Sequence, residues 1–235
     1  MPKGTGIPTA TAMADREALY RLLSWLSPGY PVGAFAYSHG LEQAVESGAV
    51  TGADSLVYWI ETVLMFGAGR VDGVLFREAW QAAAREDWKS LDEIAELGAA
   101  FQPTAEIALE ARSQGDAFLA ATRNAWPAPA LARLGNGAVH AVAVGLACAA
   151  HRIALTDGLA AYFHAFAANL VSAGVRLVPL GQSDGQAALA ALEPACAKAE
   201  TQAMAVTLDD LGSMAPLLDI GSMKHETQYS RLFRS

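Results

Sequence analysis

The histidines are the residues in this sequence best suited to bind a metal ion, and their spacing does not bring them together. There are five, namely His39, His140, His151, His164 and His225. No two form a His-x-x-x-His pattern. His140 and His151 would share nearly one helix face but lie about 16 Å apart, at about 1.5 Å per residue. We therefore predict no metal site and expect packing or hydrogen-bonding roles, while a site assembled across helices or subunits stays open.

The other reactive residues lack the surroundings that catalysis requires. The phosphate-binding pattern G-x-x-x-x-G-K-[ST] is absent, and Gly67-Ala68-Gly69-Arg70, with no strand before it, is expected to be a turn between helices. Neither Cys148 nor Cys196 has the electropositive setting of a nucleophile. Helical carboxylates such as Asp72 and Glu110 are expected to be solvated or ion-paired. We predict no catalytic residue and no cofactor.

The composition indicates a protein that hides apolar surface in contacts with other chains. Of the 235 residues, 53% are hydrophobic and 17% are charged, against about 45–50% and about 25% in average soluble domains. A surface with few charges is typical of chains that bury area in an oligomer or a partner interface. The net charge of −8 argues against binding to nucleic acid, whose phosphates require a basic surface.

The cysteines and the apolar stretches of the sequence indicate the cellular compartment in which the protein is expected to reside. Two cysteines without a Cys-x-x-Cys pair predict a reduced, cytoplasmic protein. The longest apolar stretch, Ala141–Ala150, is half the length of about 20 residues that a helix needs to cross a bilayer. It predicts a buried helix and no membrane contact. Residues 1–14 lack the apolar segment of a signal peptide and are expected to form a flexible tail.

Helical periodicity dominates the rest of the chain. The leucines of Leu19–Leu26 fall at i, i+3, i+4 and i+7 in a helix expected to begin near Asp15, and Pro28–Pro31 ends it because proline fixes φ. Capping boxes are predicted at Ser90-x-x-Glu93 and Ser183-x-x-Gln186. Further helices are expected over about 38–48, from 54, from 71, over 90–102, 104–125 and 139–153, from 156, and over 183–206 as one helix or two.

No stretch alternates long enough to predict a strand, and no internal repeat or linker divides the chain. We predict a single all-α domain over residues 15–235, built from nine or ten helices, with the apolar helix near 139–153 at its centre.

Two segments do not fit a simple helical domain. The loop Ser27–Glu42 carries aromatic rings at Phe35 and Tyr37, which either plug the domain's own core or form a contact surface. The ending, residues 222–235, concentrates tyrosine, arginine and phenylalanine, residue types that anchor interfaces. This ending either folds when a partner binds or docks on its own domain.

Both segments resemble the UreF family of urease accessory proteins. The loop resembles the family pattern Phe/Tyr-Pro-x-Gly-x-Phe-x-x-Ser-x-Gly-Leu-Glu, and the ending resembles His-Glu-x-x-Tyr-Ser-Arg-Leu-Phe-x-Ser. Between them, Glu110–Gly115 and Arg176–Gln182 are similar to family sequence in the expected order. The resemblance runs from about Leu19 to Ser235. The one departure is Tyr30, where phenylalanine is common.

The resemblance implies a dimeric, all-α protein without enzymatic activity. Such a protein binds a second accessory protein, UreD (UreH in some systems), recruits the GTPase UreG, and docks on urease apoprotein to help insert nickel. In this family the tail becomes ordered when UreD binds. The implied partner-binding residues of the tail are His225, Glu226, Tyr229, Ser230, Arg231 and Phe233. Those of the loop are Pro31, Gly33, Phe35, Ser38, Gly40 and Glu42, and Arg176 and Gln182 complete the set.

Alternatives to a scaffold stay open. One is a GTPase-regulating protein that supplies an arginine to UreG, with Arg176, Arg231 and Arg234 as candidates. Another is a helical enzyme of unknown substrate. A nickel carrier in its own right is disfavoured by the histidine spacing.

Overall fold

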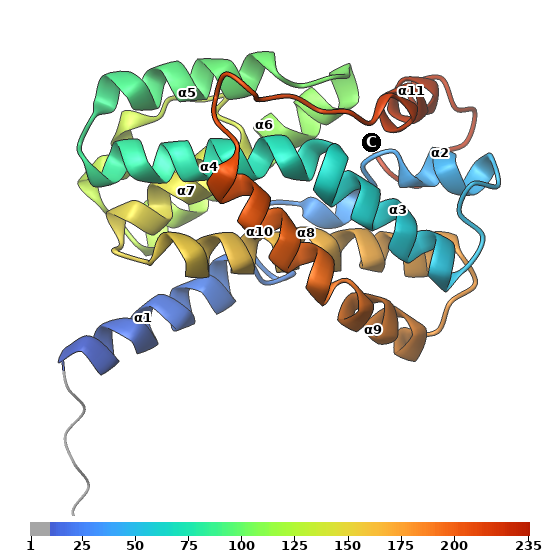
Figure 1. Ribbon diagram of the computed structural model, residues 1–235, viewed down its shortest axis with the longest axis horizontal. Helices are drawn as coiled ribbons and strands as arrows, with labels where there is room; N and C mark the ends of the chain where they lie inside the picture. The colour runs from blue at the N-terminus through green and yellow to red at the C-terminus, as the bar shows by residue number, and fades with distance from the viewer. Residues whose placement is uncertain (1–9) are drawn as a thin grey trace, which may run out of the picture.

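The chain folds into an all-α domain, as predicted. The computed structural model describes residues 10–235, and every regular element in that range is helical (Figure 1). The α-helices are α1 (Ala10–Trp25), α2 (Leu41–Glu46), α3 (Ala53–Phe66), α4 (Ala68–Ala84), α5 (Trp88–Ala100), α6 (Ala105–Ala125), α7 (His140–Ala150), α8 (Leu155–Leu177), α9 (Gln182–Ala191), α10 (Glu193–Ala205) and α11 (Pro216–His225). Two 3-10 turns, η1 (Ala34–Ala36) and η2 (Pro129–Arg133), join them. The described residues thus form eleven α-helices, where nine or ten were expected. The short α11 is the helix that was not predicted.

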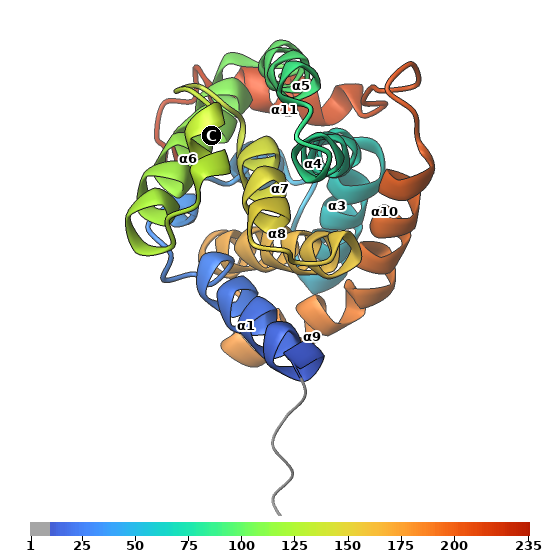
Figure 2. The same ribbon diagram turned by 90° about the vertical axis from the view of Figure 1, so that its left-hand side faces the viewer.

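Helix α7 lies at the centre of the fold. It packs mainly against α4 and α6, and Figure 2 shows it enclosed by α4, α6 and α8. All residues from Ala141 to Cys148 are buried. The stretch has no charged residue and mostly small side chains, so neighbours can approach it from every side. The predicted apolar central helix is confirmed, although it ends at Ala150, and Ile153 is buried in the turn that follows.

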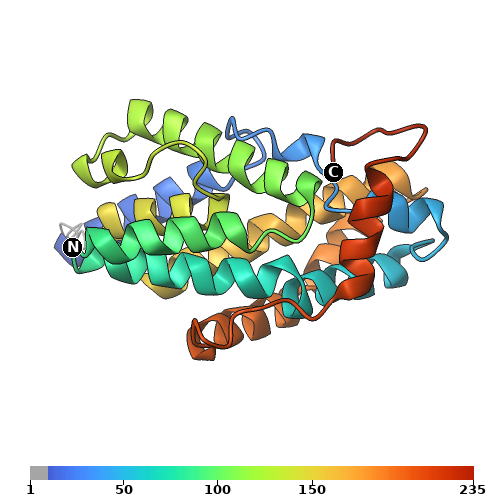
Figure 3. The same ribbon diagram turned by 90° about the horizontal axis from the view of Figure 1, so that it is seen from above.

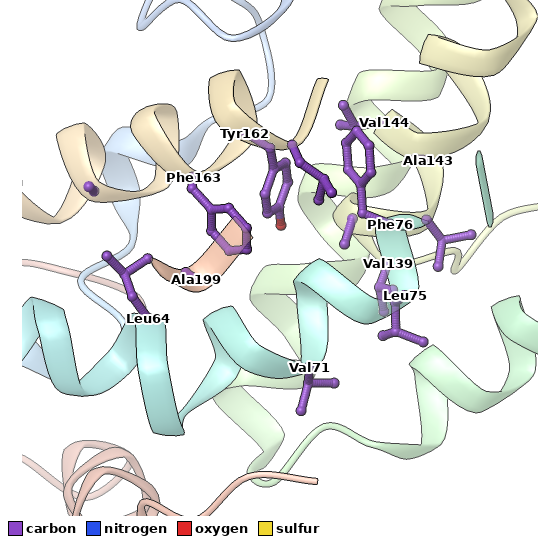
Figure 4. Close-up of a cluster of buried hydrophobic side chains, with 14 of the residues drawn as sticks. Leu64, Val71, Leu75, Phe76, Val139, Ala143, Val144, Tyr162, Phe163 and Ala199 are labelled. Atoms are coloured by element: carbon purple, nitrogen blue, oxygen red, sulfur yellow. The ribbon is translucent and has the colours of Figure 1, made fainter. Parts of the chain in front are cut away.

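The contact between α7 and α4 depends on a glycine. A Cβ atom at Gly145 would lie 2.5 Å from the carbonyl oxygen of Phe76, so any side chain there would force the two helices apart. Around this contact α8 contributes Tyr162 and Phe163, and α10 contributes Ala199 (Figure 4). One core therefore joins helices from both halves of the chain.

The first helix begins earlier than expected. Helix α1 starts at Ala10 and not near Asp15, and residues 1–9 of the expected flexible tail lie outside the described residues. In Figure 1, α1 leads away from the helical body. Its outer side exposes Leu19, Tyr20 and Leu23 at 57%, 67% and 66% of their surface, so this apolar stripe is only half covered by the domain itself.

Both predicted capping boxes are wrong. Helix α5 begins before Ser90, and the side chain of Asp87 caps it by accepting from the backbone N–H of Ser90 at 3.2 Å. Helix α9 begins at Gln182, one residue before Ser183, and the carboxylate of Asp184 accepts from the N–H of Gly181 at 2.8 Å. In each case a nearby aspartate supplies a charged acceptor, which favours the positive end of a helix more than a serine hydroxyl does.

Helix α8 is the one helix of the described residues that is long and apolar enough to cross a membrane by length and composition. Half of its most apolar window is buried inside the domain. Leu159, Phe163 and Leu170 are among its buried residues, and the helix packs along α9, α10 and α3. This burial is typical of a core helix.

The two ends of the described chain lie far apart. Figure 3 shows α11 and the residues after it beside α2, at the end of the molecule away from the start of α1. Helix α11 packs on α2 and on the beginning of α6. The two segments singled out in the sequence, residues 27–42 and 222–235, are thereby brought together.

Candidate functional site

The loop at residues 27–42 divides its two aromatic rings between the core and the surface. Tyr37 is 3% exposed, whereas Phe35 is 68% exposed. Tyr37 therefore plugs the domain's own core, whereas Phe35 lies at the surface. The loop then turns through Gly40, whose φ of 77° favours glycine because a side chain there is strained. Glu42 follows in the first turn of α2 and is buried.

Helix α6 brings two further carboxylates to this place. Thr104 caps the helix by accepting from the N–H of Ile107 at 3.2 Å. Glu106 and Glu110 follow four residues apart, which puts them on one helix face. Both are buried, at 8% and 6% exposed. With Glu42 they form a set that we call the receptor carboxylates (Glu42, Glu106 and Glu110), because they receive the C-terminal segment.

The tail, residues 222–235, is docked on the receptor carboxylates. Glu42 accepts from the backbone N–H groups of Leu232 at 2.7 Å and Phe233 at 2.9 Å. His225 is completely buried, with Nε2 3.0 Å from Glu42 and Nδ1 2.7 Å from Glu106. Arg231 adds an ion pair of 2.7 Å to Glu106. Buried carboxylates are costly unless they are paired and hydrogen-bonded, and here the tail supplies the donors.

The last residues of the tail extend this docking to the loop. Ser38 donates its backbone N–H to the carbonyl oxygen of Ser235 at 2.9 Å, and its hydroxyl donates to the same oxygen. The Ser235 hydroxyl donates to Glu110 at 2.7 Å. The N–H of Arg234 donates to the carbonyl oxygen of Ala36 at 2.8 Å. Consecutive residues of the tail are thus tied to the loop by their backbone.

Phe233 is the apolar anchor of the tail. It is 4% exposed, and the guanidinium carbon of Arg176 lies 4.3 Å from its ring centroid, within cation–π range. Arg176 also donates to the carbonyl oxygen of Phe35 at 2.9 Å. Arg176 therefore holds both the tail and the loop from the side of α8.

Of the two alternatives for the tail, the structure has it docked on its own domain. The predicted residues His225, Arg231, Phe233, Ser38, Glu42 and Arg176 meet at this site, together with Gly40, which packs against Ser222. Glu226, Tyr229 and Ser230 point outward and are exposed, as are Pro31 and Phe35 on the loop. Gly33, with φ 74°, shapes the turn into η1. Gln182 is exposed at the start of α9 and makes none of the tail contacts found among the described residues.

A pocket of about 380 Å³ opens beside the docked tail, between α1, α6 and α8. His39, Asp72, Glu110 and Tyr162 line its inner end. The Tyr162 hydroxyl donates to Asp72 at 2.7 Å. Burial raises the pKa of the Asp72 carboxyl to about 6, although the hydrogen bond from Tyr162 and the charge of His39 oppose the shift. Burial lowers the pKa of His140, also in this pocket, to about 4, which leaves its ring uncharged at neutral pH.

Sequence reasoning missed several members of this site. Glu106, Ser222 and Ser235 were not among the predicted site residues. Asp72 was expected to be solvated or ion-paired, but it accepts a hydrogen bond from Tyr162. One signal was present: Glu106 and Glu110 stand at i and i+4 just after the capping Thr104, so an acidic helix face could have been predicted, but not its burial. Within residues 10–235, no group of three or more His, Cys, Asp or Glu side chains is placed to hold a metal ion.

The fold and the site define a class: an all-α protein that folds its own C-terminal tail onto a set of buried carboxylates, with the outer side of the tail left exposed. The UreF family model matches residues 50–193. The chain is 52% identical to a protein of Granulibacter bethesdensis over 96% of its length and 97% of that protein's. It is 50% identical to one of Rhodopseudomonas palustris (strain BisB5) over 96% and 95% of the two chains, and 47% identical to one of Bradyrhizobium sp. (strain BTAi1) over 97% of each.

All three relatives are named "Urease accessory protein UreF". The chain belongs to the UreF family of urease accessory proteins, and its role lies in urease maturation. The family model does not reach the loop or the tail, but the matches to the relatives extend over nearly the whole chain.

Proposed function

We propose that this chain is a non-catalytic scaffold that binds a second urease accessory protein, UreD (UreH in some systems), and recruits the GTPase UreG. The resulting complex docks on urease apoprotein for nickel insertion, with nickel as cargo. The proposal places the chain in the cytoplasm, in keeping with two cysteines that remain free in the structure.

The observation that carries the proposal is an apolar surface on α11 and the tail that the domain leaves open. Leu217, Ile220 and Met223 are three residues apart and share one helix face. They are exposed at 78%, 46% and 52%. Tyr229, in the tail, is fully exposed, and Leu232 is 65% exposed. Aromatic and apolar side chains gathered on one surface are typical of a protein interface.

The docked tail divides the implied partner-binding residues into two groups. His225 and Phe233 are buried by the domain, so their proposed role is to hold the tail in place. Tyr229, Leu232 and the outer face of α11 are proposed to touch UreD. A tail that is ordered in advance avoids the entropy cost of folding on the partner, which favours tight binding.

The test is co-purification of the full chain with UreD and UreG. Tyr229→Ala is expected to weaken capture of UreD at least tenfold, on the order of the effect of removing an interface hot spot. Tyr58→Ala is the matched control, because Tyr58 is an aromatic residue on α3 that is 73% exposed. If Tyr229→Ala and Leu217→Asp both retain wild-type capture, the proposed surface is wrong.

A second candidate function is that the chain supplies an arginine to UreG, and Arg234 is the favoured residue. Arg176 and Arg231 are engaged by Phe233 and Glu106. Arg234 is exposed, and its side chain makes no ion pair or hydrogen bond to the described residues. Arg234→Ala is expected to lower stimulation of GTP hydrolysis on the order of 10³-fold with the complex intact, if this function holds. If Arg234→Ala stimulates GTP hydrolysis as well as the wild type does and the complex is intact, the chain acts as a scaffold and supplies no arginine.

A further inference from the structure

The pocket between α1, α6 and α8 has no part in the proposed scaffold function. Its volume of about 380 Å³ lies at the lower end of the range of about 300–1,000 Å³ that is common for small-molecule sites. Among the described residues, none after Leu189 lines it, so the tail forms no part of its wall. The pocket is therefore a feature of the helical body of the domain.

Aromatic rings form much of the wall of this pocket. Trp25 and Tyr30 contribute from the end of α1 and the loop after it, Phe35 from η1, and Tyr162 and Phe166 from α8. The face of an aromatic ring attracts a cation that lies within about 6 Å of it, and the attraction grows when water is excluded. The wall thus suits a ligand with an apolar body that carries positive charge.

The charged groups that line the pocket include two carboxylates, Asp72 and Glu110, and no lysine or arginine. The Tyr162 hydroxyl donates to one oxygen of Asp72 at 2.7 Å, and the other oxygen accepts no hydrogen bond from the described residues. Burial raises the pKa of Asp72 to about 6, so this carboxyl is still mostly ionised at about pH 7.5. Only histidines can offset the two negative charges, and the nearest is His39, whose Nδ1 lies 3.4 Å from Glu110.

The polar groups of the pocket are mainly acceptors. His140 also lines it, is uncharged at neutral pH because burial lowers its pKa to about 4, and has no hydrogen-bond partner for Nε2 among the described residues. An uncharged imidazole nitrogen can accept a hydrogen bond. A bare metal ion does not fit this chemistry, because no three ligating side chains converge within residues 10–235 and the wall is largely aromatic. A cation with N–H donors does.

We propose that this pocket binds a small organic cation, of the amidinium, guanidinium or aromatic amine class. Its N–H groups donate to Asp72, and its apolar body lies among the aromatic rings of α1 and α8. Such a molecule touches α1, α6 and α8 at once and holds the end of α1 to the rest of the domain. The proposal goes beyond the scaffold function and does not rest on it.

The first experiment compares two probes of the same shape on the full chain at about pH 7.5. Benzamidinium carries the charge, and benzamide is its neutral counterpart. Calorimetry is expected to give benzamidinium a Kd at least tenfold lower, because hydrogen bonds to charged groups are the stronger ones. In NMR the ring signals of Tyr162 and Phe166 are expected to shift along the same binding curve. Equal affinities for the two probes, or no saturable binding of benzamidinium, overturn the proposal.

The second experiment removes the charge of Asp72. Asp72→Asn keeps the shape and an acceptor for the Tyr162 hydroxyl, and it is expected to bind benzamidinium at least tenfold more weakly than the wild type does. Asp92→Asn is the matched control, because Asp92 is exposed on α5 and does not line the pocket. This control is expected to bind as the wild type does. Wild-type affinity in a folded Asp72→Asn contradicts the proposed site.

Phe35→Ala keeps the proposal testable if Asp72→Asn does not fold. Phe35 is 68% exposed, so its ring can be removed without opening the core. Loss of one cation–π contact is expected to weaken benzamidinium binding about two- to fivefold, and an unchanged Kd then overturns the proposal.

The protein concentration separates the proposed ligand from another occupant. An apparent affinity for benzamidinium that falls as the chain becomes more concentrated would mean that a second copy of the chain fills the pocket, and the proposal would be wrong. None of these measurements includes UreD or UreG, so their outcome is independent of the co-purification that tests the scaffold function.

Discussion

At the scale of single residues, the tail depends most on Glu42, which accepts hydrogen bonds from Leu232, Phe233 and His225. Glu42→Gln keeps the shape but turns one acceptor oxygen into a donor and removes the charge. Hydrogen bonds to charged groups contribute about 1.5–3 kcal/mol each. We expect the tail to open, and cleavage by trypsin after Arg231 to become at least tenfold faster, on the order of the loss of one such bond.

The matched control for Glu42→Gln is Glu46→Gln, on the same helix but exposed. It is expected to be cut at the wild-type rate. Equal cleavage rates in all three proteins would mean that Glu42 does not hold the tail.

His140 gives a prediction about acid stability. Its ring is buried against Phe118 and Tyr162, Nε2 has no hydrogen-bond partner among the described residues, and burial lowers the pKa to about 4. Below its ordinary pKa of about 6.5 the unfolded chain binds a proton that the folded chain does not. Stability is therefore lost as the pH falls from about 6.5 towards 4, by about 1.4 kcal/mol per pH unit.

His140→Phe keeps an aromatic ring and removes this proton. The wild type should lose stability through this group as the pH falls from about 7.5 to about 5, and the variant should not. The free energy of unfolding of His140→Phe, measured relative to the wild type, is therefore expected to rise by on the order of 2 kcal/mol over this range. Urea unfolding at the two pH values measures the difference. A variant that loses stability in parallel with the wild type contradicts the assignment of an uncharged, buried His140.

Several residues of the tail site could be identified from the sequence, but not their orientation. Tyrosine, arginine, histidine and phenylalanine in residues 222–235 indicated anchoring chemistry, and the same residue types anchor either a partner or the chain's own domain. In a segment that is neither helix nor strand, no periodicity of apolar residues predicts which side chains are buried and which are exposed. The burial of His225 and Phe233, and the exposure of Tyr229, depend on where Glu42 and Glu106 lie in space, which the sequence alone does not give.

At the scale of elements, the centre of the fold depends on close contact between α4 and α7. Gly145→Ala would place a Cβ 2.5 Å from the carbonyl oxygen of Phe76, and overpacking of this kind costs about 1–3 kcal/mol. Gly135→Ala is the control, since nothing lies within 4 Å of a Cβ there. Thermal unfolding is expected to show a lower Tm for Gly145→Ala only. Equal Tm values would contradict the close approach.

Helix positions could be predicted well where apolar periodicity was strong. The central helix and α6 (Ala105–Ala125) were placed within a few residues, because buried side chains repeat along them and Thr104 caps α6. The start of α1 and the caps of α5 and α9 were misplaced, because several polar residues near a helix start compete as caps. Helix α11 gave little signal, since its buried residues, Ser222 and His225, are polar, while apolar residues such as Leu217 are exposed.

At the scale of the whole molecule, two exposed apolar surfaces lie on different elements, one on α11 with the tail and one on α1. We propose that the stripe of Leu19, Tyr20 and Leu23 on α1 contributes to a homodimer. A lone helix of this length is marginal in water unless a partner covers its apolar side. Leu23→Asp is then expected to shift the chain to monomer in analytical ultracentrifugation, with helix content unchanged. A wild-type chain that is already monomeric at micromolar concentration rules the proposed dimer out.

The central claim is that the tail is docked on its own domain and presents its outer side to a partner. Hydrogen exchange of the isolated full chain tests it most directly, through the amides of Leu232, Phe233 and Arg234, which donate to Glu42 and to Ala36. The account predicts that these amides are protected without any partner, while the amide of the exposed Tyr229 exchanges quickly. If all four exchange as in a free peptide, the tail is not docked in the isolated chain and the account is wrong.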